Sequence, residues 1–293
     1  MTPPTLLRAR AQAPLATVHR ALTDADAMRV WLAEHADVDL ARQRYVFWGR
    51  YTPDGAEPRQ RLVHVDDTTL RFIWPLGGED ATTEISLAED GPDATLITLT
   101  QTHVPPWSVA VAETHVRGML PTFWELSIAN LVDYVEGREL TPKCDFTTLR
   151  MRGQVTIGAA PGEVYDSLID PERYRRWFGA NVDIEARVGG RFAMGSLDLD
   201  DEPAIIVELE PERKVVLEWP SLVATWELEG TDGGTRLTFV NSGFDEERPP
   251  YGGWLGWLGG VASLRRYHEV RHDIIWVDVR LPGLPDGMLA TEP

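Results

Sequence analysis

Few residues of this chain have the types and the spacing that catalytic or metal chemistry requires. His268 and His272 lie four residues apart, so a helix would place both imidazoles on one face, as a two-ligand metal site needs. Glu269 between them completes an HExxH spacing, but we expect solvated or core-edge histidines. Glu84 and Glu227 lie in predicted strands, where an inward carboxylate with a raised pKa could act as a general acid or base. We expect both carboxylates to face solvent instead.

Several sequence motifs of common catalytic and cofactor sites are absent. The chain has no GxGxxG, Walker loop or GxSxG motif. The acidic run Asp198–Glu202 lacks the glycine and the terminal glutamate of a calcium loop, and we interpret it as a solvated hairpin tip. Cys144 is the single cysteine, so no intrachain disulfide can form and we expect a bystander thiol. We predict no catalytic residue, no metal and no cofactor, and the chain is more simply explained as a binding protein than as an enzyme.

Length and charge set further bounds. The 293 residues are long for one hydrophobic core and suit two domains. The net charge is −18, with 12 basic and 20 acidic residues in 1–141 and 16 and 26 in 142–293. Each half would therefore repel a phosphate backbone, which excludes general nucleic-acid binding. Each half would also repel an anionic membrane surface.

The apolar segments are short. No run approaches the 18 apolar residues of a transmembrane helix, and the N-terminal segment has no apolar core of the kind a signal peptide carries. We expect no membrane insertion and a cytoplasmic protein.

The elements that must position any site are clearest between residues 155 and 194. Ala160-Pro161 and Asp170-Pro171 are helix starts, because proline fits the first helical position and the Asp170 carboxylate can accept free amide groups. Tyr174, Trp177 and Phe178 follow at helical spacing and give the second helix an aromatic face. The pattern predicts helices over 161–168, 171–178 and 251–271, with Gly259-Gly260 weakening the last, and strands over 147–158, 181–186, 190–197, 203–210, 214–219, 222–229 and 235–241.

The same pattern occurs earlier in the chain. A shift of 146 residues places Trp31 on Trp177, a shift of 145 places 72–75 on 217–220, and a shift of 133 places Trp124 on Trp257. The gradual change of offset indicates a tandem duplication with loops of different length. For the first copy we predict helices over 14–22, 25–33 and, from near Pro121, up to 136, and strands over 5–12, 44–51, 60–66, 69–74, 82–88 and 94–102.

These motifs resemble the activator of heat shock protein 90 ATPase homologue family, within the START-like (SRPBCC) superfamily. The resemblance is strong over 150–270 and weaker over 6–137, where no Val-Gly-Gly-Arg-Phe equivalent is visible and Asp24-Ala25 replaces Asp-Pro. The residues that carry it are Ala160-Pro161, Val164-Tyr165, Asp170-Pro171, Trp177-Phe178, Val188-Gly189-Gly190-Arg191-Phe192, Leu209-Glu210-Pro211, Trp219, Gly234-Thr235-Arg236-Leu237-Thr238 and Ser242-Gly243-Phe244.

The resemblance implies an α+β helix-grip fold in each copy. A curved antiparallel sheet of about seven strands would wrap a long C-terminal helix, with two short helices after the first strand. We predict a first START-like domain over 1–141, a second over 142–272 and a C-terminal extension over 273–293.

The resemblance also implies a cavity between sheet and helix, which aromatic side chains would line. The chain has 11 tryptophans, and these fill two cores if they do not line a pocket. The pocket candidates are Trp177, Phe178, Trp219, Trp226, Trp257, Val261 and Leu264 in the second copy and Trp31, Trp74 and Trp124 in the first.

Three functions stay open at this point. The chain could bind a small hydrophobic molecule without catalysis, and the second copy, which keeps the motifs better, would then be the binder. It could be an enzyme similar to polyketide aromatase/cyclases, since didomain START-like proteins of similar length have that activity. It could also be a stress-response protein that associates with heat shock protein 90 as a chaperone partner, as the family name implies. The sequence leaves the oligomeric state undetermined.

Overall fold

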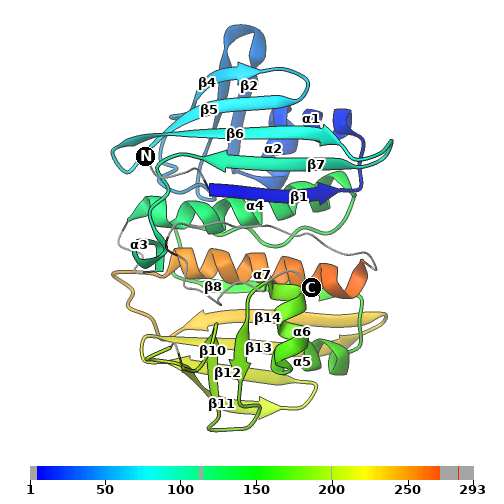
Figure 1. Cartoon of the computed structure of the whole chain (residues 1–293), viewed down its shortest axis with the longest axis vertical. Coiled ribbons are helices and arrows are strands. Elements are labelled where there is room, and N and C mark those ends of the chain that lie inside the picture. The colour runs from blue at the N-terminus through cyan, green and yellow to red at the C-terminus, as the bar shows by residue number, and fades with distance from the viewer. Residues whose placement is uncertain (1–4, 112–114, 199, 271–282, 284–293) are drawn as a thin grey trace. The chain divides into compact units, whose positions relative to one another are not determined.

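The computed structural model describes residues 5–111, 115–198, 200–270 and 283 (Figure 1). Its residue contacts define two compact units. Unit 1 holds the described residues up to Thr148 together with Tyr251–Gly259, and unit 2 holds Leu149–Pro250 together with the described residues from Gly260 to Val270. The domain limits at 141 and 272 stay a prediction, and the extension over 273–293 lies outside the described residues except for Gly283.

Unit 1 is built from two sheets and a long helix. Its five-stranded antiparallel sheet has the order β1-β7-β6-β5-β4, and β2 pairs with β3 separately. Figure 1 shows α4 running along the larger sheet. The elements are β1 (Thr5–Ala11), α1 (Leu15–Thr23), α2 (Ala25–Trp31), β2 (His35–Asp39), β3 (Arg44–Trp48), β4 (Arg61–Val65), β5 (Thr69–Leu76), β6 (Glu79–Glu89), β7 (Thr95–Gln101), α3 (Trp107–Val111) and α4 (Leu120–Val135).

The seven strands of unit 1 divide into five and two instead of forming the one sheet that we expected. The cause lies between β3 and β4, where the Phe47 amide donates a 3.1 Å hydrogen bond to the side-chain Oε1 of Gln60. A side-chain acceptor thus takes the place of a strand carbonyl, and no backbone ladder joins β3 to β4. Strand β2 was not predicted at all, because its sequence HADVD shows no apolar alternation.

Unit 2 confirms the helix-grip prediction more fully. All seven of its strands form one antiparallel sheet in the order β8-β14-β13-β12-β11-β10-β9. Two short helices follow the first strand, as expected. The elements are β8 (Met151–Ile157), α5 (Pro161–Ile169), α6 (Pro171–Phe178), β9 (Val182–Ile184), β10 (Arg191–Met194), β11 (Ala204–Glu210), β12 (Lys214–Trp219), β13 (Leu222–Thr231), β14 (Gly234–Ser242) and the part of α7 (Tyr251–Glu269) that follows Gly259.

The duplication is visible in hydrogen bonds as well as in element order. The Thr95 hydroxyl donates to the Ala13 carbonyl oxygen at 2.8 Å, and the Thr235 hydroxyl donates to the Ala159 carbonyl oxygen at 2.7 Å. Each threonine begins the inward-facing row of the last strand of its sheet, and each acceptor lies just before the first short helix. The two hydrogen bonds therefore show that Thr95 on β7 and Thr235 on β14 occupy equivalent positions in the two copies.

Helix α7 is continuous through its paired glycines, although glycine weakens a helix interior. A Cβ atom on Gly260 would lie 2.9 Å from the Phe178 ring, and one on Gly259 would lie 3.2 Å from the carboxyl carbon of Glu125. The glycines are needed because neighbouring side chains approach the helix backbone closely. This packing, which involves residues distant in the sequence, offsets the low helix propensity.

Candidate functional site

Helix α6 and the adjoining strands of unit 2 bring five aromatic rings into one group. Tyr174 lies 4.4 Å from Trp177, 5.4 Å from Phe178 and 5.6 Å from Phe192, measured between ring centroids. Phe192 on β10 continues the group to Trp219 at the end of β12, at 6.2 Å. Edge-to-face and tilted arrangements at these distances are those that aromatic rings favour. We call Tyr174, Trp177, Phe178, Phe192 and Trp219 the aromatic wall.

The aromatic wall is buried in its middle and half-buried at Phe178 and Trp219, its two ends. Tyr174, Trp177 and Phe192 are buried, while Phe178 and Trp219 are half-buried. Two large apolar side chains of the group thus keep part of their surface in contact with solvent. Covering that surface with an apolar molecule is favourable by about 25 cal/mol per Å².

Tyr174 adds a polar group to this apolar surface. Its hydroxyl oxygen is buried and has no hydrogen-bond partner among the described residues. Burial raises the pKa of the phenol, so the group stays neutral at physiological pH. A neutral hydroxyl can both donate to and accept from a bound molecule.

The other predicted pocket residues of unit 2 lie in its core. Trp226 on β13 packs against Phe239 on β14, with 4.2 Å between ring centroids. Val261 and Leu264 on α7 are both buried. Trp257 is half-buried and lies in the part of α7 that belongs to unit 1.

The three candidates of unit 1 are packed into a filled aromatic core. Trp31, Trp74 and Trp124 are at most 2% exposed. The Trp74 ring contacts Phe47 at 5.1 Å, Phe123 at 5.6 Å and Trp124 at 6.0 Å. In unit 1 the tryptophans therefore fill the space that a ligand would need.

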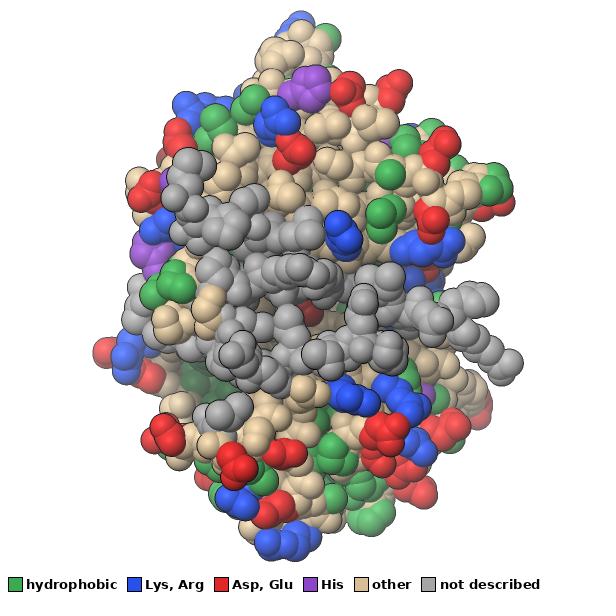
Figure 2. All heavy atoms as spheres, viewed as in Figure 1, with side chains coloured by type: hydrophobic (Ala, Val, Ile, Leu, Met, Phe, Trp, Pro, Cys, Tyr) green, Lys and Arg blue, Asp and Glu red, His purple; other side chains and the backbone are tan. Residues whose placement is uncertain are grey.

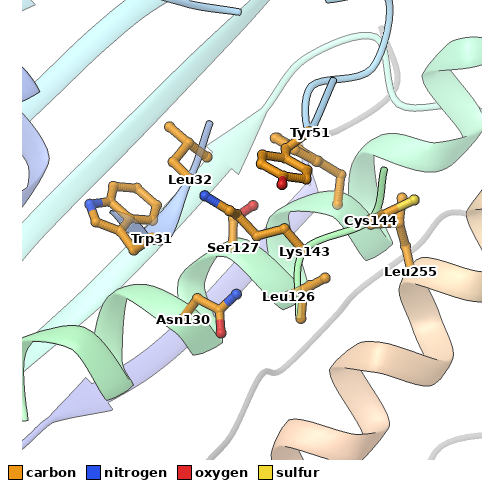
Figure 3. Close-up of a pocket in the computed structure, with 10 residues that line it drawn as sticks. Trp31, Leu32, Tyr51, Leu126, Ser127, Asn130, Lys143, Cys144 and Leu255 are labelled. Atoms are coloured by element: carbon orange, nitrogen blue, oxygen red, sulfur yellow. The ribbon is translucent and has the colours of Figure 1, made fainter. Parts of the chain in front are cut away.

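A small cavity of about 10 Å³ lies in unit 1 beside Lys143 (Figure 3). The Lys143 ammonium donates to the carbonyl oxygens of Arg29, Val30 and Ala33 at 2.9, 3.0 and 3.2 Å, and it lies 4.6 Å from the ring centroid of Tyr51. Burial lowers the pKa of Lys143 to about 8. A cavity of this size has room for about one water molecule. Lys143 thus attaches the segment after α4 to the end of α2 and has a structural role.

A second hollow of unit 1 is an open groove of about 730 Å³. Trp48 and His35 lie on it with ring centroids 5.3 Å apart, and Arg50 pairs with Glu34 at 2.9 Å. Opposite charges on its surface compensate one another. Charges of both signs are also interspersed over the surface seen in Figure 2.

Most of the side chains that the sequence marked as candidates for chemistry pair with a neighbouring side chain or face solvent. Glu84 pairs with Arg71 on the solvent face of its sheet, and Glu227 is exposed, so both face outward as predicted. His268 Nε2 lies 3.1 Å from the Ser167 hydroxyl, and burial lowers the pKa of this imidazole. His272 lies outside the described residues. The described part of the chain contains no cluster of three metal-ligating side chains.

Two groups were not anticipated from the sequence. The sequence places Tyr174 on the aromatic face of a helix, but only the structure shows that its hydroxyl has no hydrogen-bond partner among the described residues. Glu125 on α4 is the second, because burial raises the pKa of its carboxyl to about 7. A charged residue among the apolar positions of α4 (LPTFWELSIANLV) is the signal that could have drawn attention to it.

Comparison with known proteins agrees with the duplication. The sequence model described as "Activator of Hsp90 ATPase homolog 1-like protein" matches residues 12–136 and 158–268. None of the curated proteins matches this chain. No helix in the described part of the chain is long and apolar enough to cross a membrane.

Several solved structures are similar to parts or most of the chain. Protein MLL2253 from Mesorhizobium loti is 23% identical, with 41% of this chain and 97% of that chain covered and a TM-score of 0.37. CalU16 from Micromonospora echinospora is 24% identical, with 42% and 74% covered and a TM-score of 0.36. DynU16, a putative protein in the dynemicin biosynthetic locus, is 16% identical, with 90% and 98% covered and a TM-score of 0.34.

Proposed function

Because this chain belongs to the family of activator of Hsp90 ATPase homolog 1-like proteins, in tandem duplication, we propose that it binds a small hydrophobic molecule in unit 2 without transforming it. The aromatic wall would be the binding surface. The single observation that carries this proposal is the contrast in exposure between the two copies: Phe178 and Trp219 keep solvent-accessible surface, whereas Trp31, Trp74 and Trp124 do not.

The physical reason is the composition of the surface. A site that binds a small apolar molecule needs rigid apolar walls and few polar groups, which fix the orientation of the ligand. The aromatic wall supplies five rings and, in the Tyr174 hydroxyl, one neutral hydrogen-bonding group. Unit 1, whose rings contact one another, would then serve as a scaffold.

A polyketide cyclase-like activity is the second candidate, and the same hydroxyl favours it. A neutral phenol inside an apolar site could hold a ketone of a folded polyketide chain in one orientation. Turnover of a linear polyketide substrate analogue by the full-length chain, and its loss in Tyr174→Phe, would favour the enzyme over the carrier. A bound ligand recovered unchanged would favour the carrier.

The experiment that tests binding is native mass spectrometry of the purified full-length chain, followed by denaturing extraction. We expect a retained apolar molecule of a few hundred daltons in the wild type and loss of most of it in Trp219→Ala. Trp48→Ala is the matched control, because Trp48 is also a half-buried tryptophan but lies on the open groove of unit 1. Equal retention of the molecule in both variants would contradict binding at the aromatic wall. A ligand-free wild type that captures heat shock protein 90 would contradict the ligand and favour the chaperone partner.

A further inference from the structure

The side chain of Asn241 is a buried carboxamide on the last strand of unit 2. It lies on β14, is 3% exposed, and neither its Oδ1 nor its Nδ2 atom has a partner among the described residues. Residues that alternate along β14 show which way it points: Leu237, Phe239 and Asn241 are all buried and face the interior of unit 2. The carboxamide therefore ends the inward row of the last strand.

An unpaired carboxamide in such a position needs an explanation. The group has two donor hydrogens and an acceptor oxygen. In the unfolded chain water makes hydrogen bonds to them, and folding loses these bonds unless a new partner replaces the water. Buried polar atoms without partners are uncommon in folded proteins, and each one calls for an explanation such as strain, a catalytic role, or a bound water molecule or ion. A bound molecule would supply the missing partner.

Unit 1 repeats this arrangement at the equivalent position. Gln101 follows Thr95 by six residues on β7, as Asn241 follows Thr235 by six on β14, and the two threonines make the same hydrogen bond. Gln101 is 1% exposed, and its Nε2 atom has no partner among the described residues. Each copy thus places a buried carboxamide at the same inward position, with its nitrogen unpaired among the described residues.

The neighbours of Asn241 indicate which chemical group it would hold. Its partners across the sheet are Met151 on β8 and Ala224 on β13, and Ala224 is followed on β12 by Leu217. These side chains carry no charge, so this part of the sheet favours a neutral group. Ala224 occupies the place that Thr83 takes beside Gln101 in unit 1, so this neighbour of the carboxamide has no hydroxyl in unit 2.

On these grounds we propose that Asn241 is the polar contact that selects a carbonyl or hydroxyl group on the hydrophobic ligand of unit 2. The inference rests on the function proposed above and adds the class of ligand, a mostly apolar molecule with a neutral oxygen function. The carboxamide would donate to a carbonyl oxygen through Nδ2 and accept from a hydroxyl through Oδ1.

The test uses two probes of equal size, 2-acetylnaphthalene and 2-ethylnaphthalene, and the full-length chain. They differ in one carbonyl oxygen. We expect the wild type to bind the ketone about tenfold more tightly, which corresponds to about 1.4 kcal/mol. In Asn241→Leu, of similar shape but without polar atoms, the two affinities should become equal. Asn241→Ala should behave in the same way and serves if the leucine variant does not fold.

Gln154→Leu is the matched control. Gln154 lies on β8 with its side chain on the exposed face, where it donates to the Thr238 hydroxyl at 3.2 Å. This variant should keep the preference for the ketone. A wild type that binds both probes equally, or an Asn241 variant that keeps the preference, would overturn the inference and leave binding by unit 2 intact. Failure of the wild type to bind either probe would overturn the proposed function and the inference together.

Discussion

The indole N–H of Trp177 donates a 2.8 Å hydrogen bond to the carbonyl oxygen of Ser167, ten residues earlier in the chain. Trp31 makes the same bond to the carbonyl oxygen of Ala21 at 3.0 Å, also across ten residues. In each unit the bond joins the second short helix to the first. A pocket-lining role was one explanation for these tryptophans, and the bond gives them a definite structural role.

Replacing either tryptophan with phenylalanine should destabilise its unit. Trp177→Phe and Trp31→Phe each remove the indole donor, leave a buried carbonyl oxygen without it, and open a cavity beside the helix. We expect each to lower the free energy of unfolding by about 2–4 kcal/mol, measured by urea denaturation. A loss of stability in one variant and not in the other would contradict the structural equivalence of the two copies.

Local signals in the sequence predicted most of the fold. The Asp170 carboxylate accepts from the Arg173 amide at 2.9 Å and the Asp24 carboxylate from the Ala27 amide at 2.8 Å, as helix-start residues do. The strand predicted over 69–74 is β5, in which Leu70, Phe72 and Trp74 alternate and are buried. Such features depend on neighbours in the sequence and can therefore be predicted from it.

Features that depend on distant residues could not be predicted. Gln60 divides the sheet of unit 1 by bonding to Phe47, and nothing in the pattern of either segment announces this contact. The unpaired states of Tyr174 and Asn241 are likewise properties of their surroundings. A carboxamide at an inward position of an alternating strand, as in Gln101 and Asn241, is a sequence signal that could have pointed toward the polar contact.

A pair of tyrosines tests the importance of the unpaired hydroxyl. Tyr174→Phe removes a buried hydroxyl without a partner and should stabilise the ligand-free chain by about 1 kcal/mol. The Tyr251 hydroxyl contacts the carbonyl oxygens of Phe146 and Thr148, each at 3.1 Å, so Tyr251→Phe should destabilise the chain by about 1 kcal/mol. Urea denaturation of both variants measures the two changes. Destabilisation by Tyr174→Phe would show that its hydroxyl has a partner after all.

The two lysines of the chain should differ sharply in their contribution to stability. Lys143→Met removes the donor that serves three carbonyl oxygens near the end of α2, where the helix dipole also favours a cation, and should cost about 2–3 kcal/mol. Lys214→Met breaks an ion pair with Glu208, whose side chain is 38% exposed, and should cost less than about 1 kcal/mol. Thermal and urea unfolding of the two variants provide the comparison. Similar losses would mean that the contacts of Lys143 add little.

The carboxyl group of Glu125 should make stability depend on pH. Burial raises its pKa in the folded chain to about 7, whereas an unfolded glutamate has a pKa of about 4.3. Between these values the folded state binds more protons than the unfolded state, so the free energy of unfolding falls as pH rises from about 4.3 to about 7 and stays low above it. Below pH 4 the carboxyl is protonated in both states and has no effect.

Glu125→Gln should remove this dependence, because glutamine keeps the shape of the protonated acid and cannot ionise. We expect the variant to match the wild type at pH 4 and to be more stable by about 1–3 kcal/mol at pH 8. One pKa unit corresponds to about 1.4 kcal/mol. The lower part of the range allows for the solvent that reaches this half-buried side chain. Glu84→Gln is the control, because Glu84 is paired with Arg71 on the solvent face and should show no such gain at pH 8. Urea denaturation at the two pH values measures the difference. A Glu125→Gln variant that is less stable than the wild type at pH 8 would mean that the ionised carboxylate is stabilised in the folded chain, and that Glu125 is charged where α4 meets Gly259.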